Sequence, residues 1–359
     1  MPFPWTGAFC GGGAPDAADP VTLSRRQLLQ FALGSGFGAV LPSVMAADTL
    51  RLGLISDLNS SYGSVSYIPQ VTRGLRQLMA LRPELIVCAG DMVAGQKRGL
   101  TARELDAMWN CFASDVLQPL SEAGISFLPA IGNHDGAPGF AADRSAVARF
   151  WSPLRSALGL NFCDQAHFPF HYSVLQDSVF WIVWDASSHR IPDVQLEWAR
   201  QQLASSSARQ ARLRLVVGHL PLFGIGRGKD RYGESLDQLL TIRTLLEEGQ
   251  VQAYISGHQH VWYPARWGDL DLIQLGALGS GPRRLIAGGG AAQQTFTMLA
   301  VNWSQSTLTE TTYAVSSGRA LDWDAVPSML TCRSGSLERN DQNRRFRHSG
   351  VPFHSLPVL

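Results

Sequence analysis

From residue 50 onward, short apolar runs alternate with longer stretches in which apolar residues recur every three or four positions. The short runs have the length of buried strands, whereas the longer stretches have the period of amphipathic helices. Strands are predicted at 50–56, 85–89, 126–131, 213–217 and 251–255. Helices are predicted at 68–81, 105–117, 194–203 and 236–248. This alternation is typical of an α/β fold with largely parallel strand pairing.

The pattern of apolar and polar residues after position 170 sets the C-terminal limit of the globular domain. Two apolar runs at 171–175 and 179–184 are separated by three polar residues and predict an antiparallel hairpin. Residues 270–315 alternate short strand-like runs with glycine clusters. Residues 327–359 are rich in Arg, Ser and Asn and have no periodic apolar face, which predicts a mobile tail. The globular domain is therefore expected to span residues 48–326.

The N-terminus has the organisation of an export signal. Arg25 and Arg26 precede an apolar, glycine-interrupted stretch that ends in small residues near Ala46. This order resembles a twin-arginine signal peptide, so residues 1–47 are expected to be read by the twin-arginine export machinery. The apolar stretch is short for a membrane span. We therefore expect an exported protein, periplasmic or extracellular.

Composition and charge exclude some classes of protein. The hydrophobic content of 45% is that of a soluble globular protein, and a net charge of +1 argues against a general nucleic-acid binder. No specific nucleic-acid partner and no stable membrane partner is indicated. The cysteines lack C-x-x-C spacing, which argues against a zinc knuckle or a thioredoxin-like site. A disulfide between Cys111 and Cys163 is left open by the sequence.

Five short polar motifs follow the predicted strands in a fixed order. They are Asp57-Leu58-Asn59, Gly90-Asp91, Gly132-Asn133-His134-Asp135, Gly218-His219 and Gly257-His258-Gln259-His260. Each lies just past the carboxyl end of a strand, where α/β sheets place their ligands. Each motif alone is a weak signal, because a Gly-Asp pair is most often a turn and a lone histidine is most often a hydrogen-bonded core residue. Together, in this order, they predict one shared site.

The residue types in these motifs indicate a pair of metal ions. Carboxylate, amide and imidazole groups are the ligands that divalent transition metals accept. Two such cations activate a bridging water and clamp the oxygens of a phosphate for in-line displacement. The motifs therefore indicate metal-dependent hydrolysis of a phosphate ester, with the ester as the expected substrate partner.

The ordered motifs resemble those of the calcineurin-like metallophosphoesterase superfamily over residues 50–263. The resemblance implies a four-layer α/β/β/α sandwich of two mixed β-sheets flanked by helices. It also implies two divalent metal ions, drawn from manganese, iron, zinc and cobalt. The implied ligands are Asp91 between the metals, Asp57 and His260 on the first metal, and Asn133, His219 and His258 on the second.

The same resemblance implies a catalytic mechanism. A hydroxide that bridges the two metals would attack the phosphorus, and His134 would assist the leaving group. Imidazole suits this role because its pKa lies near neutrality. Asp135, the next residue, would orient His134.

Asn59 departs from the pattern of the superfamily, which usually has a histidine at this position. An amide oxygen is a poorer donor than imidazole, so the first metal is expected to bind more weakly or to use a water there. Purple acid phosphatases also lack this histidine, but they have a tyrosine three residues after the bridging aspartate. This chain has Ala94 at that position, so neither a tyrosinate ligand nor a purple colour is expected.

Asn59 also leaves open an alternative function. The chain could be a non-catalytic exported protein that binds metal or phosphate and whose first metal site is degraded. We favour an enzyme, because every other ligand and His134 are present.

The loop after His219 contains three basic residues that could contact a substrate phosphate, namely Arg227, Lys229 and Arg231. A solvated basic loop is an equally good interpretation. The loop lacks the spacing of a P-loop, so no nucleotide-binding loop is predicted. Phosphomonoesters and phosphodiesters cannot be separated on these residues, because both reactions use the same metal core.

Overall fold

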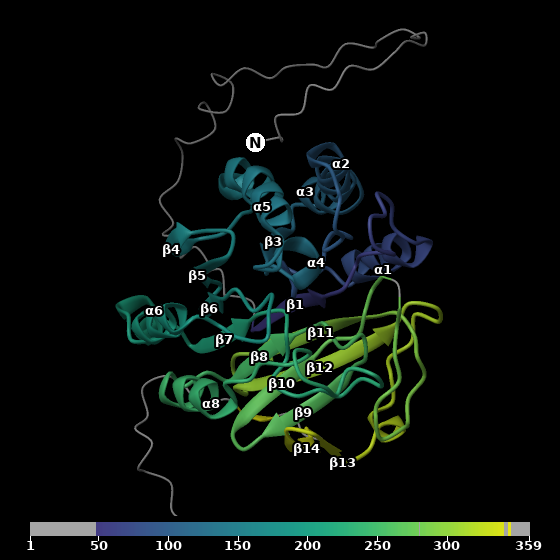
Figure 1. The fold of residues 1–359 in the computed structure, drawn as a ribbon. Helices are drawn as coiled ribbons and strands as arrows, with labels where there is room; N and C mark the ends of the chain where they lie inside the picture. The colour runs from purple at the N-terminus through teal and green to yellow at the C-terminus, as the bar shows by residue number, and fades with distance from the viewer. Residues whose placement is uncertain (1–47, 280, 341–343, 346–359) are drawn as a thin grey trace, which may run out of the picture. The chain divides into compact units, whose positions relative to one another are not determined.

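Two β-sheets form the centre of the fold in the computed structural model, which describes residues 48–279, 281–340 and 344–345 (Figure 1). The predicted export signal at 1–47 lies outside these residues. The first sheet has the strand order β15-β12-β11-β1-β2-β3. Its strands are β1 (Thr49–Ile55), β2 (Leu85–Cys88), β3 (Ser126–Pro129), β11 (Thr295–Asn302), β12 (Thr307–Ala314) and β15 (Arg344–Arg345). The predicted strands β1, β2 and β3 pair in parallel, and β11 runs antiparallel to β1.

The second sheet has the strand order β13-β14-β9-β10-β8-β7-β6-β5-β4. Its strands are β4 (Phe162–His167), β5 (His171–Gln176), β6 (Val179–Val183), β7 (Leu213–Val217), β8 (Ala253–Ser256), β9 (Tyr263–Trp267), β10 (Leu270–Gln274), β13 (Met329–Cys332) and β14 (Gly335–Arg339). The predicted hairpin is present as β5 and β6. Strands β6, β7, β8 and β10 are parallel, and the others are antiparallel.

Helices cover the outer face of each sheet. Those on the first sheet are α1 (Pro69–Ala80), α2 (Ala102–Phe112) with its π-helical continuation Ala113–Leu117, α3 (Gln118–Glu122) and α5 (Ala141–Leu154). Those on the second sheet are α6 (Asp193–Leu203), α7 (Ser206–Gln210) and α8 (Leu239–Glu248). The short helix α4 (Asn133–Gly136) and two 3₁₀ turns (Arg155–Ala157 and Trp323–Ala325) complete the helical elements.

Alternation along the strands divides the core into three apolar layers. Leu54, Val87 and Leu128 are partners across β1, β2 and β3 and pack between the two sheets together with Trp181 and Leu215 of the second sheet. Neighbouring residues point the other way and pack under the helices. Each fully buried side chain of this size contributes about 1.5–3 kcal/mol. The predicted four-layer α/β/β/α sandwich is confirmed.

The structure corrects the mobile tail predicted from residue 327. Strands β13 and β14 form a hairpin that extends the second sheet by pairing β14 with β9. Leu330 and Leu337 are fully buried in the core under that sheet. Exposed residues flank each of these two leucines, so the buried face has a period of two and is hidden within an arginine-rich composition. Residues 341–343 and 346–359 lie outside the described part of the chain.

The structure also shows where α2 begins and the state of the cysteines. Helix α2 begins three residues before the predicted start, because Thr101 and Glu104 form a capping box at its N-terminus. Cys111 and Cys163 are free, as are the other cysteines of the described residues.

Candidate metal centre

The five motifs meet at one edge, where the carboxyl ends of strands from both sheets come together. Asp57 follows β1, Asp91 follows β2, and Asn133 follows β3 of the first sheet, whereas His219 and His258 follow β7 and β8 of the second. Backbone hydrogen bonds join the loops. The Asp57 N–H donates to the Gly90 carbonyl at 3.0 Å, and the Gly257 N–H donates to the His219 carbonyl at 3.0 Å.

Four of the converging residues have an unusual backbone conformation. Their φ angles are positive, at 54° for Asp57, 56° for Asp91, 67° for His258 and 56° for His260. This left-handed region costs a residue other than glycine about 1–3 kcal/mol, and such residues cluster at functional sites. The surrounding fold therefore holds these four side chains in place at some cost in stability.

Gly257 makes the close packing of the two sheets possible at this edge. A Cβ atom at this position would lie 2.6 Å from Asp57 Oδ2 and would also meet the Ser56 side chain. No L-residue with a side chain fits there without a shift of the neighbouring strand end. The glycine thus allows the His258 N–H to donate to Asp57 Oδ2 at 3.0 Å.

Two clusters of side chains at this edge have the composition of metal sites, and they share Asp91. The first cluster is Asp57, Asp91 and His260, and the second cluster is Asp91, His219 and His258. Within each cluster the ligand atoms lie within 4.8 Å of one another. His260 Nε2 is 3.1 Å from Asp57 Oδ1, and His219 Nε2 is 3.2 Å from Asp91 Oδ2. Mixed oxygen and imidazole donors of this kind fit divalent transition metals.

Backbone carbonyls orient two of the three imidazoles. His219 Nδ1 is 2.7 Å from the Ala89 carbonyl oxygen, and His260 Nδ1 is 2.9 Å from the Gly281 carbonyl oxygen. A carbonyl only accepts, so Nδ1 carries a proton in both rings and Nε2 is the atom directed at the clusters. This is the arrangement that a metal ligand requires.

Asn133 directs its amide oxygen at the second cluster. Its Oδ1 atom is 3.0 Å from His219 Nε2 and 2.8 Å from His258 Nδ1. Its Nδ2 group donates to Gln96 Oε1 at 2.7 Å, which fixes the orientation of the amide. Gln96 was not predicted from the sequence, since it lies in the loop after Asp91 with no motif of its own.

Burial and charge perturb the ionisation of the clusters. Burial raises the pKa of the Asp91 carboxyl, but the charges of His219 and His134 outweigh this and hold that pKa well below its usual range. Burial lowers the pKa of His219, but Asp91 outweighs this and raises it to about 9. Burial lowers the pKa of His258 to about 4 despite its hydrogen bond with Glu234. Such perturbed groups in one place are typical of functional sites.

His134 lies beside the shared carboxylate. Its Nε2 atom is 3.9 Å from Asp91 Oδ2, and 14% of its side chain is exposed. The ring of Tyr62 lies against it, with ring centroids 4.6 Å apart. Its Nδ1 atom is buried and has no hydrogen-bond partner among the described residues. Packing against Tyr62 therefore holds the ring.

The structure corrects the role predicted for Asp135. Its Oδ1 atom accepts from the Val93 N–H at 2.9 Å, and its Oδ2 atom accepts from the Gly132 N–H at 2.8 Å. Burial and the charge of Asp91 raise the pKa of the Asp135 carboxyl to about 7. The carboxylate joins the loops after β2 and β3 and makes no hydrogen bond to the His134 ring, so the predicted orienting role is wrong.

Asn59 is buried next to the position where a tyrosine ligand would stand. Its exposed fraction is 4%, and its backbone N–H donates to the Asp91 carbonyl at 3.2 Å. Asn59 and Ala94 line the same cavity of about 10 Å³. The ligand role predicted for Asn59 stays a prediction.

Two of the three basic residues in the loop after His219 contact a carboxylate that was not predicted from the sequence. Glu234 Oε2 is 2.8 Å from Lys229 Nζ, and Glu234 Oε1 is 2.8 Å from Arg231 Nη2. The Arg231 side chain is 71% exposed, and Arg227 is also exposed. Lys229 and Arg231 thus have an acidic partner within their own loop.

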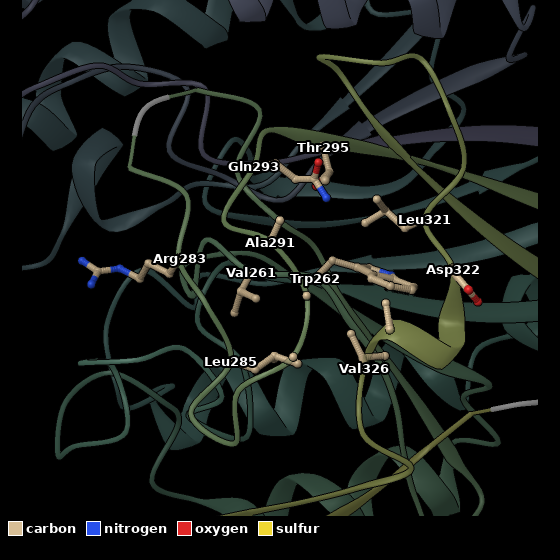
Figure 2. A pocket seen from close by; sticks show the side chains of 13 residues that line it. Val261, Trp262, Arg283, Leu285, Ala291, Gln293, Thr295, Leu321, Asp322 and Val326 are labelled. Atoms are coloured by element: carbon tan, nitrogen blue, oxygen red, sulfur yellow. The ribbon is translucent and has the colours of Figure 1, made fainter.

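An apolar pocket lies beside the segment that follows His260 (Figure 2). Its volume is about 70 Å³, and its walls include Trp262, Leu285 and Val326. In Figure 2 the side chain of Arg283 extends away from these apolar walls. Val261 and Trp262, which follow the last metal motif directly, thus contribute to an apolar surface.

The family of calcineurin-like phosphoesterases matches residues 50–262, more than half of the chain. The chain therefore belongs to the calcineurin-like phosphoesterase family. No curated protein matches the sequence. In the part of the chain that the structure describes, every helix is too short or too polar to cross a membrane.

Two solved structures share the fold. One is a purple acid phosphatase from yellow lupin (Lupinus luteus) seeds, with a TM-score of 0.55, 14% identity, and coverage of 76% of this chain and 53% of that chain. The other is GAP50, the anchor in the inner membrane complex of Plasmodium, with a TM-score of 0.50, 14% identity, and coverage of 76% and 87%. The chain spans about half the length of the lupin protein. At these identities the likeness shows the fold alone.

Proposed function

We propose that this chain hydrolyses phosphate esters with two divalent cations, drawn from manganese, iron, zinc and cobalt. The observation that carries the proposal is the pair of clusters that share Asp91, because a dinuclear site needs one carboxylate common to two sets of ligands. The proposed ligands are the six side chains that converge at the sheet edge, namely Asp57, Asp91, Asn133, His219, His258 and His260.

When bound, the two cations supply an activated water for attack on phosphorus and neutralise the charge of the phosphate oxygens. His134 is placed beside the shared carboxylate and is partly exposed, so it can give a proton to the leaving oxygen. Tyr62 limits the freedom of the His134 ring by packing against it. Asn59 is proposed as a weak ligand or as a neighbour of a water at the first cation.

The substrate is a phosphomonoester or a phosphodiester. Since Glu234 engages Lys229 and Arg231, Arg227 is the basic residue of this loop that we propose for contact with the substrate phosphate. The arginine pair before residue 47 supports export through the twin-arginine machinery, to the periplasm or outside the cell.

The proposal is tested by assaying the purified protein with p-nitrophenyl phosphate and bis(p-nitrophenyl) phosphate. We expect hydrolysis of at least one ester with added manganese and none with chelator. His134→Gln should lower kcat by about 10²–10⁴-fold because it removes the proton donor. His167→Gln, which changes an exposed histidine on β4, should keep the wild-type rate. If neither ester is hydrolysed with any of the four metals, the proposed function is wrong.

A second candidate is a non-catalytic exported protein that binds metal or phosphate. The observation in its favour is the pair Asn59 and Ala94, which leaves the first cluster without either a histidine or a tyrosine at these positions. The number of cations bound per chain separates the two candidates.

A further inference from the structure

Glu234 lies in the loop after His219 and directs its carboxylate at His258. Its Oε2 atom is 2.7 Å from His258 Nε2 and 2.8 Å from Lys229 Nζ. The side chains of Glu234 and Lys229 are only 14% and 15% exposed. The three groups therefore form a compact, partly buried chain behind the second cluster.

Glu234 contacts the Nε2 atom of His258, the ring nitrogen that faces away from the second cluster. His258 turns its Nδ1 atom to the second cluster, 2.8 Å from Asn133 Oδ1 and 3.3 Å from His219 Nε2. An imidazole that offers Nδ1 to a cation must carry its proton on Nε2, and that N–H needs an acceptor. His219 and His260 use backbone carbonyls as this acceptor, whereas His258 uses the Glu234 carboxylate.

Gln259, the residue after His258, keeps Glu234 in place. Its Nε2 group donates to the Glu234 carbonyl at 2.7 Å. Its Oε1 atom accepts from the N–H groups of Ile225 and Gly226 at 3.0 and 2.9 Å. The loop that carries Glu234 is thus docked on the segment that carries the histidine, and Lys229 balances the charge of the carboxylate.

We infer that Glu234 is a positioning residue of the metal centre, which sets the tautomer and orientation of His258 for the second cation, with Lys229 as its counter-ion. The inference rests on the proposed function, because it concerns the same pair of cations. It gives Lys229 a role in support of the metal site in place of contact with the substrate. Outer partners of this type contribute about 10–100-fold to metal affinity.

The test is a calorimetric titration of chelator-treated protein with cobalt, in the absence of any ester. Glu234→Ala should weaken one of two cobalt sites by about 10–100-fold and leave the other unchanged. Glu234→Gln keeps a neutral acceptor for the ring N–H, so its loss should be smaller. Glu338→Gln changes an exposed carboxyl on β14 and should leave both affinities as in the wild type. Thermal unfolding without metal serves as the check on folding.

Equal cobalt affinities in the wild type and Glu234→Ala would overturn the inference. A single cobalt site whose affinity is the same in both proteins would also overturn it. If Glu234→Ala does not fold, unchanged affinities in Glu234→Gln overturn it instead. Failure of the proposed function gives a different result. If Glu234→Ala weakens one cobalt site but the wild type hydrolyses neither ester, only the proposed phosphoesterase activity is refuted.

Discussion

At the scale of single residues, the centre combines strained positions with compensating contacts. Asp57, Asp91, His258 and His260 all have positive φ angles, and each is held by backbone or side-chain hydrogen bonds from a neighbouring loop. Asn59 stands apart, since it holds a buried neutral amide where the family usually has a histidine, and it lines a small cavity with Ala94. This residue is therefore where the chain is expected to differ from its family in metal binding.

We expect Asn59→His to raise the affinity of one cation by about tenfold, because imidazole is a better donor than an amide oxygen. Elemental analysis after dialysis against manganese measures the number of ions per chain, which should rise towards two. Asn59→Ala serves as the matched control and should not raise the metal content. If Asn59→His leaves the metal content unchanged, the position does not face the first cation.

At the scale of elements, the C-terminal hairpin supports the loop of the metal centre. The Arg333 N–H, between β13 and β14, donates to Asp230 Oδ2 at 3.0 Å. Asp230 follows Lys229 directly, and the same loop continues to Glu234. The hairpin therefore stabilises both the second sheet and the segment that positions His258.

Leu337→Ala should lower the free energy of unfolding by about 2–5 kcal/mol, because it leaves a cavity under the second sheet. Met329→Ala on the same hairpin is the matched control, since Met329 is 58% exposed. Its effect should stay within about 0.5 kcal/mol. Urea denaturation followed by circular dichroism measures both, and equal effects would contradict the structural role of the hairpin.

At the scale of the whole domain, the centre depends on how the two sheets pack, because each sheet supplies half of its side chains. Two polar contacts cross between the sheets away from the centre. The Tyr172 hydroxyl donates to the Pro129 carbonyl at 2.6 Å, and Trp262 Nε1 donates to Glu310 Oε1 at 2.6 Å. Burial, with the charge of Asp271, raises the pKa of Glu310 to about 7 against the effect of the Trp262 hydrogen bond.

This pKa makes the packing of the sheets sensitive to pH. The Glu310 carboxyl holds its proton up to a pH of about 7 in the folded state, whereas in the unfolded chain it releases the proton near its ordinary pKa of 4.5. The contribution of the protonated Glu310 to the free energy of unfolding is therefore complete below pH 4.5 and is lost as the pH rises through about 7. Raising the pH from about 5 to about 8 should therefore destabilise the wild type relative to Glu310→Gln. Urea denaturation of the metal-free proteins measures the difference. Glu338→Gln, which replaces an exposed carboxyl, should show the same pH dependence of stability as the wild type. A wild type that becomes more stable relative to Glu310→Gln as the pH rises would refute the raised pKa of Glu310.

The sequence by itself determined most of the helices and strands and the residue types that make up the metal centre. Local periodicity predicts β1, α1 and the hairpin of β5 and β6, because one face of each must be buried. The glycines and polar residues after the strands predict a common edge, because parallel strands end together. Asp91 and His258 could be assigned to one site on this basis alone.

Only the tertiary structure decided which partners these side chains meet. Asp135 accepts from Val93, Gln96 fixes the amide of Asn133, and Glu234 contacts His258, although no spacing in the sequence links these pairs. The β13 and β14 hairpin was missed for the same reason, since its two leucines are recognisable as core only once the second sheet is present. Local pattern determines which surface of an element is buried, whereas long-range contacts determine what lies against it, and the metal centre is built from the latter.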